Sequence, residues 1–242
     1  MSTAALGNVD TAVKPAAVNG PVCAPARGLH VEPLQRFVFS NVTWREFEAF
    51  CAALPERHFR LAYDGSELEI MATSHLHGRL SRLMAQIVII LTDELNMPRQ
   101  SGGDFTLKGE QVERSIQGDE SFYLTNEPKV RNKDKIDLTR DPPPDLAIEI
   151  EVTDSVLDRL AIYKKLRVPE VWRFDGKRIQ VLQLGADGEY VPVERSRYFP
   201  QVDLKEIVAF IQRRDEMDET TLMRSFRAWV QGQIARNWQS SS

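Results

Sequence analysis

A short apolar segment with acids at alternating positions, PPPDLAIEIEV at residues 142–152, limits what this chain can form. Side chains alternate between the two faces of a β-strand, so the even-numbered apolar residues share one face while Asp145, Glu149 and Glu151 share the other. Acids are depleted from strands, and a buried charge without a partner is costly. We therefore expect a strand with one core face and one acidic face, whose partner is either a divalent cation or solvent.

Hydrophobic spacing predicts five helices and several short strands around this segment. The expected helices are residues 43–54, 73–96, 155–168, 202–214 and 219–237. The expected strands are a hairpin over 59–71 that turns at Asp64-Gly65, followed by 104–108, 120–124, 170–174, 178–184 and 190–194. Residues 126–141 are polar and charged, which is typical of a loop.

This order of elements predicts a mixed α/β fold in which helices pack against a mixed sheet. The acid-bearing strand, the helix after it and the strand over 170–174 should form a parallel strand-helix-strand crossover. Residues 1–35 are rich in Ala, Val, Pro and Gly without a period, so we expect a disordered leader there. Residues 36–240 are then expected to form one domain.

Composition narrows the class of protein further. The net charge is -4, which gives no global basic footprint for nucleic acid, although a local basic groove would be enough to bind it. Two cysteines, Cys23 and Cys51, do not make a disulfide framework. The longest apolar run, IVIIL at 87–91, is far shorter than a membrane span. With no signal peptide pattern either, we expect a cytoplasmic protein without a membrane partner.

Four stretches in order along the chain resemble a known family. They are YDGSELEIM with the following His77, GDESFYL, PPPDLAIEIEVTDSVLDRLAIY and VPEVWRFDG. Together they resemble the Uma-type (DUF820-like) family of predicted restriction endonucleases, within the PD-(D/E)xK nuclease superfamily. The resemblance covers about residues 38–228 and implies a restriction-endonuclease-like core with flanking helices. It also implies Mg²⁺-dependent (or Mn²⁺-dependent) hydrolysis of DNA phosphodiester bonds.

In that superfamily an Asp and a Glu on neighbouring strands hold the metal, and a Lys two residues after the Glu shares their face. By resemblance, Asp119 takes the place of the Asp, although Gly118 precedes it instead of Pro, and Glu149 takes the place of the Glu. Hard carboxylate oxygens suit Mg²⁺, which lowers the pKa of a bound water and neutralises phosphoryl charge.

The position of the motif Lys holds Glu151, a reversal of charge. The Uma-type family commonly carries that Lys on the following helix, where the matching residue is Arg159. Arginine can stabilise negative charge on a phosphoryl group but cannot act as a base. Lys164 and Lys165 lie further along the same helix as alternatives, and Glu151 could be a further ligand, a partner of Arg159 or a solvent-facing acid.

Three more residues complete the set of candidates. Glu69 matches a family acid that would assist at the metal, and His77 matches a His at the start of the long helix. Asp145 is either a further ligand or only the first residue of its strand. The His75-x-His77 pair does not predict a zinc site, because the chain has only four His and two Cys.

Two functions stay open. One is a metal-dependent DNA endonuclease, in which the basic loop KVRNKDK at 129–135 either meets the phosphate backbone or is merely solvated. The other is a non-catalytic descendant of the same fold that binds nucleic acid or a protein, with Arg159 and Glu151 paired. Nucleases that cut both strands often act as homodimers. Motifs of serine hydrolases and zinc proteases are absent from the sequence.

Overall fold

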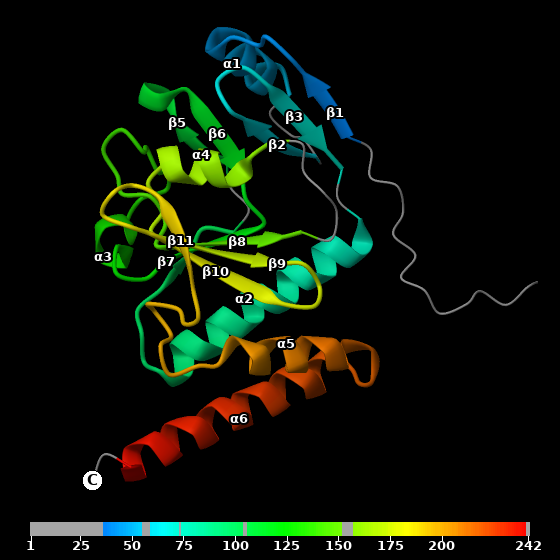
Figure 1. The fold of residues 1–242 in the computed structure, drawn as a ribbon, viewed down its shortest axis with the longest axis vertical. Helices are drawn as coiled ribbons and strands as arrows, with labels where there is room; N and C mark the ends of the chain where they lie inside the picture. Colours follow the sequence, from blue (N-terminus) through cyan, green and yellow to red (C-terminus); the bar gives the residue numbers. More distant parts are fainter. Residues whose placement is uncertain (1–35, 55–58, 73, 104–105, 152–156, 241–242) are drawn as a thin grey trace, which may run out of the picture. The chain divides into compact units, whose positions relative to one another are not determined.

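The acid-bearing strand β8 (Leu146–Ile150) and the long helix α2 (His75–Glu94) lie at the centre of the structure (Figure 1). The structure is a computed structural model, and it describes residues 36–54, 59–72, 74–103, 106–151 and 157–240. The leader expected at residues 1–35 lies outside these described residues, as do residues 152–156 between β8 and the next helix.

Strand β8 belongs to a six-stranded sheet in the order β11-β10-β9-β8-β7-β4. β8 and β9 are parallel, with Leu146 opposite Glu170 and Ile150 opposite Phe174, and the other neighbours are antiparallel. The remaining bounds are β4 Gln100–Ser101, β7 Glu120–Tyr123, β9 Glu170–Phe174, β10 Ile179–Leu184 and β11 Tyr190–Val193. The parallel pair is the crossover that the sequence predicted.

A second, five-stranded sheet is antiparallel throughout and has the order β1-β3-β2-β6-β5. Its strands are β1 Arg36–Phe39, β2 Arg60–Tyr63, β3 Leu68–Met71, β5 Thr106–Gly109 and β6 Arg114–Gln117. The β2-β3 hairpin turns at Asp64, whose carboxylate accepts from the backbone N–H groups of Ser66 and Glu67. Gly65 follows it with φ +97°, a conformation that strongly favours glycine.

The helices cover both sheets. Their bounds are α1 Trp44–Ala53, α3 Glu127–Val130, α4 Arg159–Lys165, α5 Leu204–Gln212 and α6 Glu219–Ser240, with 3₁₀ turns η1 Glu110–Val112 and η2 Arg213–Asp215. α2 packs against β8, α6 packs against α2, and α5 contacts both α2 and β10 (Figure 1). None of the described helices is both long enough and apolar enough to cross a membrane.

The two faces of β8 meet different surroundings. Leu146, Ile148 and Ile150 are buried in the large core that α2 and α6 complete. On the other face, Ala147 belongs to a second core, in which residues of α4 pack between the two sheets. The alternation read from the sequence is therefore confirmed, and the opposite face of β8 is buried too. Glu149 lies on that buried face and is only 4% exposed, so it needs partners within the protein.

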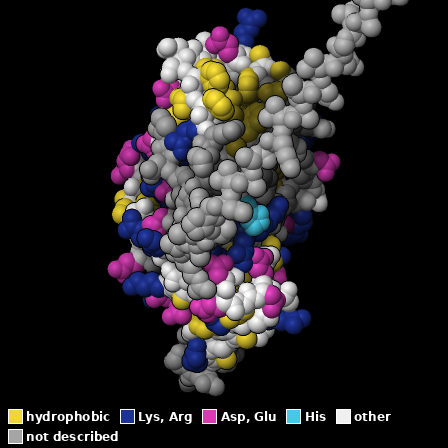
Figure 2. Space-filling view, turned by 90° about the vertical axis from the view of Figure 1, so that its right-hand side faces the viewer, with side chains coloured by type: hydrophobic (Ala, Val, Ile, Leu, Met, Phe, Trp, Pro, Cys, Tyr) yellow, Lys and Arg dark blue, Asp and Glu magenta, His cyan; other side chains and the backbone are white. Residues whose placement is uncertain are grey.

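Hydrophobic side chains also gather on the surface at the end of the molecule formed by the five-stranded sheet (Figure 2). The most exposed of the large apolar residues described there are Phe37 and Phe39 of β1, at 58% and 50%. Isolated surface apolar residues are ordinary, but neighbouring exposed aromatics on one strand are not.

The mixed α/β class with flanking helices, expected from the sequence, is confirmed. The division of the strands between two sheets was not foreseen, and strands β1, β4 and β6 were missed. Each is four residues or shorter, so none gives a long alternating pattern. The predicted loop over 126–141 contains the short helix α3 and is otherwise free of regular structure in the described chain.

Candidate active site

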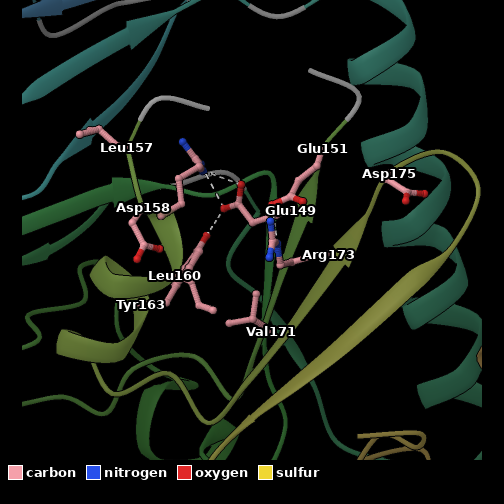
Figure 3. Close-up of a pocket in the computed structure, with 10 residues that line it drawn as sticks. Glu149, Glu151, Leu157, Asp158, Leu160, Tyr163, Val171, Arg173 and Asp175 are labelled. Atoms are coloured by element: carbon pink, nitrogen blue, oxygen red, sulfur yellow. Dashed lines mark hydrogen bonds and ion pairs between the residues drawn. The ribbon is translucent and has the colours of Figure 1, made fainter. Parts of the chain in front are cut away.

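Glu149 is the centre of the candidate site, and a guanidinium group neutralises it. Arg159 donates from Nε to Oε2 at 2.8 Å and from Nη2 to Oε1 at 3.1 Å, which is a bidentate ion pair. The Tyr163 hydroxyl donates to Oε1 of the same carboxylate. Figure 3 shows the Glu149 and Tyr163 side chains pointing toward each other. A buried carboxylate is thus held by two side chains from one helix.

Helix α4 supplies both partners because of its register. Arg159 and Tyr163 are four residues apart, so they lie on the same face of the helix, one turn apart. Asp158 begins the helix as its N-cap, and its carboxylate accepts from the N–H of Ala161 at 3.0 Å. Arg159 also donates from Nη2 to the carbonyl of Gln117 at 2.9 Å, which ties the helix start to the end of β6.

Asp119 lies beside this pair, in the connection between β6 and β7. Its Oδ2 accepts from the backbone N–H of Ile150 at 2.6 Å, so it is fixed to the end of β8 directly after Glu149. Its Oδ1 lies 3.1 Å from Arg60 Nε and 3.2 Å from His77 Nε2. The structure therefore brings Asp119, Glu149, Arg159 and His77 together, four of the residues chosen from the sequence.

His77 reaches Asp119 from the first turn of α2. Ser74 caps that helix, and its hydroxyl accepts from the His77 N–H at 3.2 Å, so the helix starts with His77 directed into the protein. The imidazole is buried, and within the described chain its Nδ1 has no hydrogen-bond partner. His75, two residues earlier, is exposed.

The two carboxylates are buried in different electrostatic settings. Burial opposes the ionised form of Asp119, but its contact with His77 and the charge of Arg60 hold the pKa of Asp119 below its ordinary value. Burial raises the pKa of Glu149, since it outweighs the opposing charge of Arg159, and the charge of Asp119 acts in the same direction as burial. Burial opposes the charged form of Arg159 too, yet the charge of Glu149 raises its pKa.

Gly118 is the residue that replaces the motif Pro, and its backbone lies against Tyr163. A Cβ at this position would collide with the Tyr163 hydroxyl and would lie 3.5 Å from Glu149 Oε1. A side chain is therefore excluded at this position for a steric reason: the space that a larger residue would need is filled by the hydroxyl that holds Glu149.

Two predicted ligands lie in other surroundings. The Asp145 carboxylate accepts from the N–H groups of Leu124 and Asn126 at 2.7 and 2.8 Å, and from the Asn126 side chain at 3.0 Å. It thereby fixes the chain after β7, and these contacts account for its burial. Glu69 is buried on β3, 3.6 Å from the guanidinium of Arg36 on the neighbouring strand β1.

Glu151 is at the mouth of the site and pairs with Arg173 of β9, at 2.5 Å between Oε1 and Nε. Of the alternatives for Glu151, pairing with Arg159 is not among the ion pairs of the described residues, since Arg159 pairs with Glu149. Figure 3 shows Glu151 and Arg173 beside Glu149. Both Glu151 and Arg173 line a cavity of about 350 Å³ together with Glu149, Arg159 and other residues of α4 and β9. Four carboxylates and two guanidinium groups line this cavity, so it carries excess negative charge: Glu149, Glu151, Asp158, Asp175, Arg159 and Arg173.

The lysines offered as substitutes for the motif Lys are not part of this cluster. Lys164 pairs with Glu189 at 3.0 Å, and Lys165 is exposed. In the basic loop, Arg131 pairs with Glu127 and Lys133 pairs with Asp141, so part of its charge is balanced locally.

Sequence reasoning missed two residues of the site, Arg60 and Tyr163. Arg60 comes from β2, and besides approaching Asp119 it donates to the carbonyl of Gly118. Arg60 is far from Asp119 in the sequence, so no local pattern links the two residues. Tyr163 did have one, since its spacing of four residues from Arg159 places both on one helix face.

The donor set can be tested for a divalent cation. No group of three or more His, Cys, Asp or Glu side chains in the described chain has an arrangement that could hold a metal ion. Asp119 and Glu149 do offer two hard carboxylates at the end of β8, and Oδ1 of Asp119 is buried without a hydrogen bond of good geometry to the described residues. A pair of carboxylates with water in the other positions fits Mg²⁺, which keeps several waters. Of the two carboxylates, Glu149 lines the acidic cavity.

Comparison with known proteins shows to which family the chain belongs. Residues 44–214 match a family model described as "Putative restriction endonuclease", and this match spans more than half of the chain. The chain belongs to the Uma2 family. Among solved structures it is similar to a "putative nuclease belonging to DUF820" from Anabaena variabilis ATCC 29413, at 14% identity and a TM-score of 0.45, over 70% of this chain and 99% of that chain. No curated protein matches it significantly.

Replacing Gly118 by Ala should destabilise the protein by about 1–3 kcal/mol, because the new methyl group collides with the Tyr163 hydroxyl and overpacking costs this much. Urea denaturation measures the change. Gly78→Ala in α2 is the matched control: nothing lies within 4 Å of the added Cβ, so it should not destabilise. In a Tyr163→Phe background the cost of Gly118→Ala should largely vanish; an undiminished cost there would contradict the collision.

Asp119→Asn should lower the free energy of unfolding at pH 7 by about 3–5 kcal/mol, because Arg60 and His77 lose a buried negative partner. The pKa of Asp119 is lowered in the folded state, so its stabilisation is present above the unfolded-state value of about 3.9 and is lost as the pH falls through the folded-state value. The gap between wild type and variant should therefore narrow below about pH 4. Urea titrations at several pH values measure this gap.

Glu151→Gln serves as the control for that experiment. Its ion pair with Arg173 is about one-third exposed on both sides, so its removal should cost at most about 1 kcal/mol at pH 7. A gap for Asp119→Asn that stays constant from pH 7 to pH 3 would show that the carboxylate charge does not stabilise the fold.

Proposed function

We propose that this chain is a metal-dependent nuclease that hydrolyses DNA phosphodiester bonds at Asp119 and Glu149, using Mg²⁺ or Mn²⁺. The observation that carries the proposal is the bidentate contact between Arg159 and Glu149. It supports Arg159 as the functional replacement of the motif Lys, supplied by helix α4 instead of by the strand. Membership of the Uma2 family supports the reaction class.

Each residue of the site would have a separate role. Asp119 and Glu149 would hold the cation, which when bound lowers the pKa of a water and neutralises charge on the phosphoryl group. Arg159 keeps Glu149 in place and can donate in a planar fork to phosphate oxygens. Tyr163 orients Glu149, and His77 with the Ile150 N–H orients Asp119.

The charge of the cavity favours cation binding before phosphate binding. Acids outnumber guanidinium groups among its lining residues, so a bare phosphate would be repelled and a cation attracted. A bound metal ion would add positive charge to the site and so make it attract the phosphate group. The basic loop over 129–135 is not required for this step.

A second candidate function is a non-catalytic module that binds nucleic acid or a protein. The observation in its favour is that Arg60 and Arg159 already neutralise Asp119 and Glu149. In that case the cluster would be a structural ion-pair network, and the protein would remain folded without any metal-dependent activity.

Purified protein with supercoiled plasmid, single-stranded DNA and RNA as substrates distinguishes the two functions. We expect Mg²⁺- or Mn²⁺-dependent nicking that EDTA abolishes, and a loss of roughly 100-fold or more in Glu149→Gln and Asp119→Asn, because the metal supplies several kcal/mol of transition-state stabilisation. Glu189→Gln removes an exposed carboxylate outside the cavity and should leave the rate unchanged. Activity retained in both site variants would refute the assignment, and no cleavage by the wild type would favour the non-catalytic module.

Metal affinity gives a test that does not depend on a DNA substrate. Arg60→Gln should raise the affinity for Mn²⁺ by a factor on the order of ten, because a positive charge 3.1 Å from Asp119 competes with the cation. Isothermal titration calorimetry measures it. Arg140→Gln, a change at an exposed cation away from the site, should leave the affinity unchanged. An unchanged affinity in Arg60→Gln would argue against Asp119 as a ligand.

A further inference from the structure

Strand β1 presents an unprotected edge to the outside of the five-stranded sheet. It is the last strand in the order β1-β3-β2-β6-β5 and pairs only with β3 in the described sheet. Phe37, Val38 and Phe39 follow one another along it and are 58%, 37% and 50% exposed. The hydrophobic side chains at that end of the molecule are visible in Figure 2. An exposed apolar edge of this kind is a template for pairing with another strand.

The other sheet edges of the described chain carry features that discourage such pairing. β11 has Pro192 in its middle, β5 carries Lys108, and β4 is only two residues long. The charge on β1, Arg36, lies 3.6 Å from Glu69 of its own sheet. β1 therefore stands apart from the other described edges, as a short strand whose exposed residues are all apolar.

We propose that a second copy of this chain covers β1, by antiparallel pairing of the two β1 strands about a two-fold axis at Val38. The sequence of the strand is complementary to itself in this register. Val38 faces Val38 of the other copy, and each Phe37 faces a Phe39, so the aromatic rings form two cross-strand pairs on one face. Directly opposed aromatic side chains stabilise an antiparallel pair. A two-fold interface requires this self-complementarity.

The opposite face is complementary in charge. Arg36, Val38 and Ser40 share that face, because side chains alternate along a strand. In the proposed register Arg36 faces Ser40 of the other copy, whose hydroxyl donates to Glu67 at 3.4 Å. The pairing thus brings a guanidinium group beside a carboxylate at each end of the interface. The two five-stranded sheets would join into one continuous sheet.

This inference is independent of the proposed nuclease activity, because β1 does not contribute to the Asp119 cluster. If the protein does cleave both strands of DNA, two copies would supply the two sites. A pairing of only five residues in each copy, β1 and the following Ser40, predicts a weak, concentration-dependent dimer instead of an obligate one.

Disulfide trapping tests the register. In a chain with Cys23→Ser and Cys51→Ala, Val38→Cys should form a covalent dimer under mild oxidation, because directly opposed Cα atoms lie about 4.5–5.5 Å apart, within disulfide range. Ser40→Cys on the same edge is the matched control. In the proposed register the two introduced cysteines would be offset by four residues along the strands, which is beyond the roughly 7 Å limit, so this variant should form no covalent dimer. Equal cross-linking of both variants, or none in Val38→Cys, would overturn the proposal.

Sedimentation equilibrium tests the surface without any cysteine. We expect a reversible dimer of the wild type at roughly 100 μM, and a dissociation constant raised at least about tenfold in Phe37→Asp. Val191→Asp, at an exposed apolar position of edge strand β11, should dimerise like the wild type. A full-length chain that stays monomeric, and dimerises only after residues 1–34 are removed, would overturn the proposal by showing that the chain covers its own edge. A dimer equally strong in Phe37→Asp would overturn it as well.

Discussion

The ion pair between Glu149 and Arg159 governs how the rest of this structure is arranged. A carboxylate on a strand that is buried on both faces would be destabilising by several kcal/mol if it stood alone. The fold accommodates this carboxylate because the Arg159 guanidinium binds it with two N–H groups. This contact constrains the direction, register and start of helix α4. The contacts of Glu149 also constrain Gly118, because the Tyr163 hydroxyl leaves no space for a side chain there. One buried charge thus constrains the position of helix α4 and the residue type at position 118, before β7.

The pattern of alternation in β8 could be read from the sequence, and so could the importance of Glu149. An acid between two isoleucines on a strand has few explanations, and all of them demand a specific partner. Helix α2 was equally readable, because its apolar stripe and its Ser74 cap are local features. These successes share one property: the decisive residues are close together in the chain.

The features that could not be read are those formed by distant segments. Arg60 reaches Asp119 from a strand of the other sheet, and no spacing rule connects the two residues. The division into two sheets depends on which of several short strands pair, and strands of four residues carry little pattern. For Asp145 the sequence left two alternatives open, a ligand or the first residue of its strand, and its contacts with backbone N–H groups of the chain after β7 could not be read from either.

The arrangement also explains how a reversed charge at position 151 can be accommodated. Because Arg159 of α4 neutralises Glu149, the residue two positions after Glu149 is not needed for that purpose. Glu151 instead pairs with Arg173 on the parallel neighbour β9, at the mouth of the cavity. That exchange makes the cavity more acidic than a strand-borne lysine would, while Arg159 keeps a positive charge at its floor. Its lining residues carry more carboxylates than guanidinium groups, so its field favours a cation over a bare phosphate.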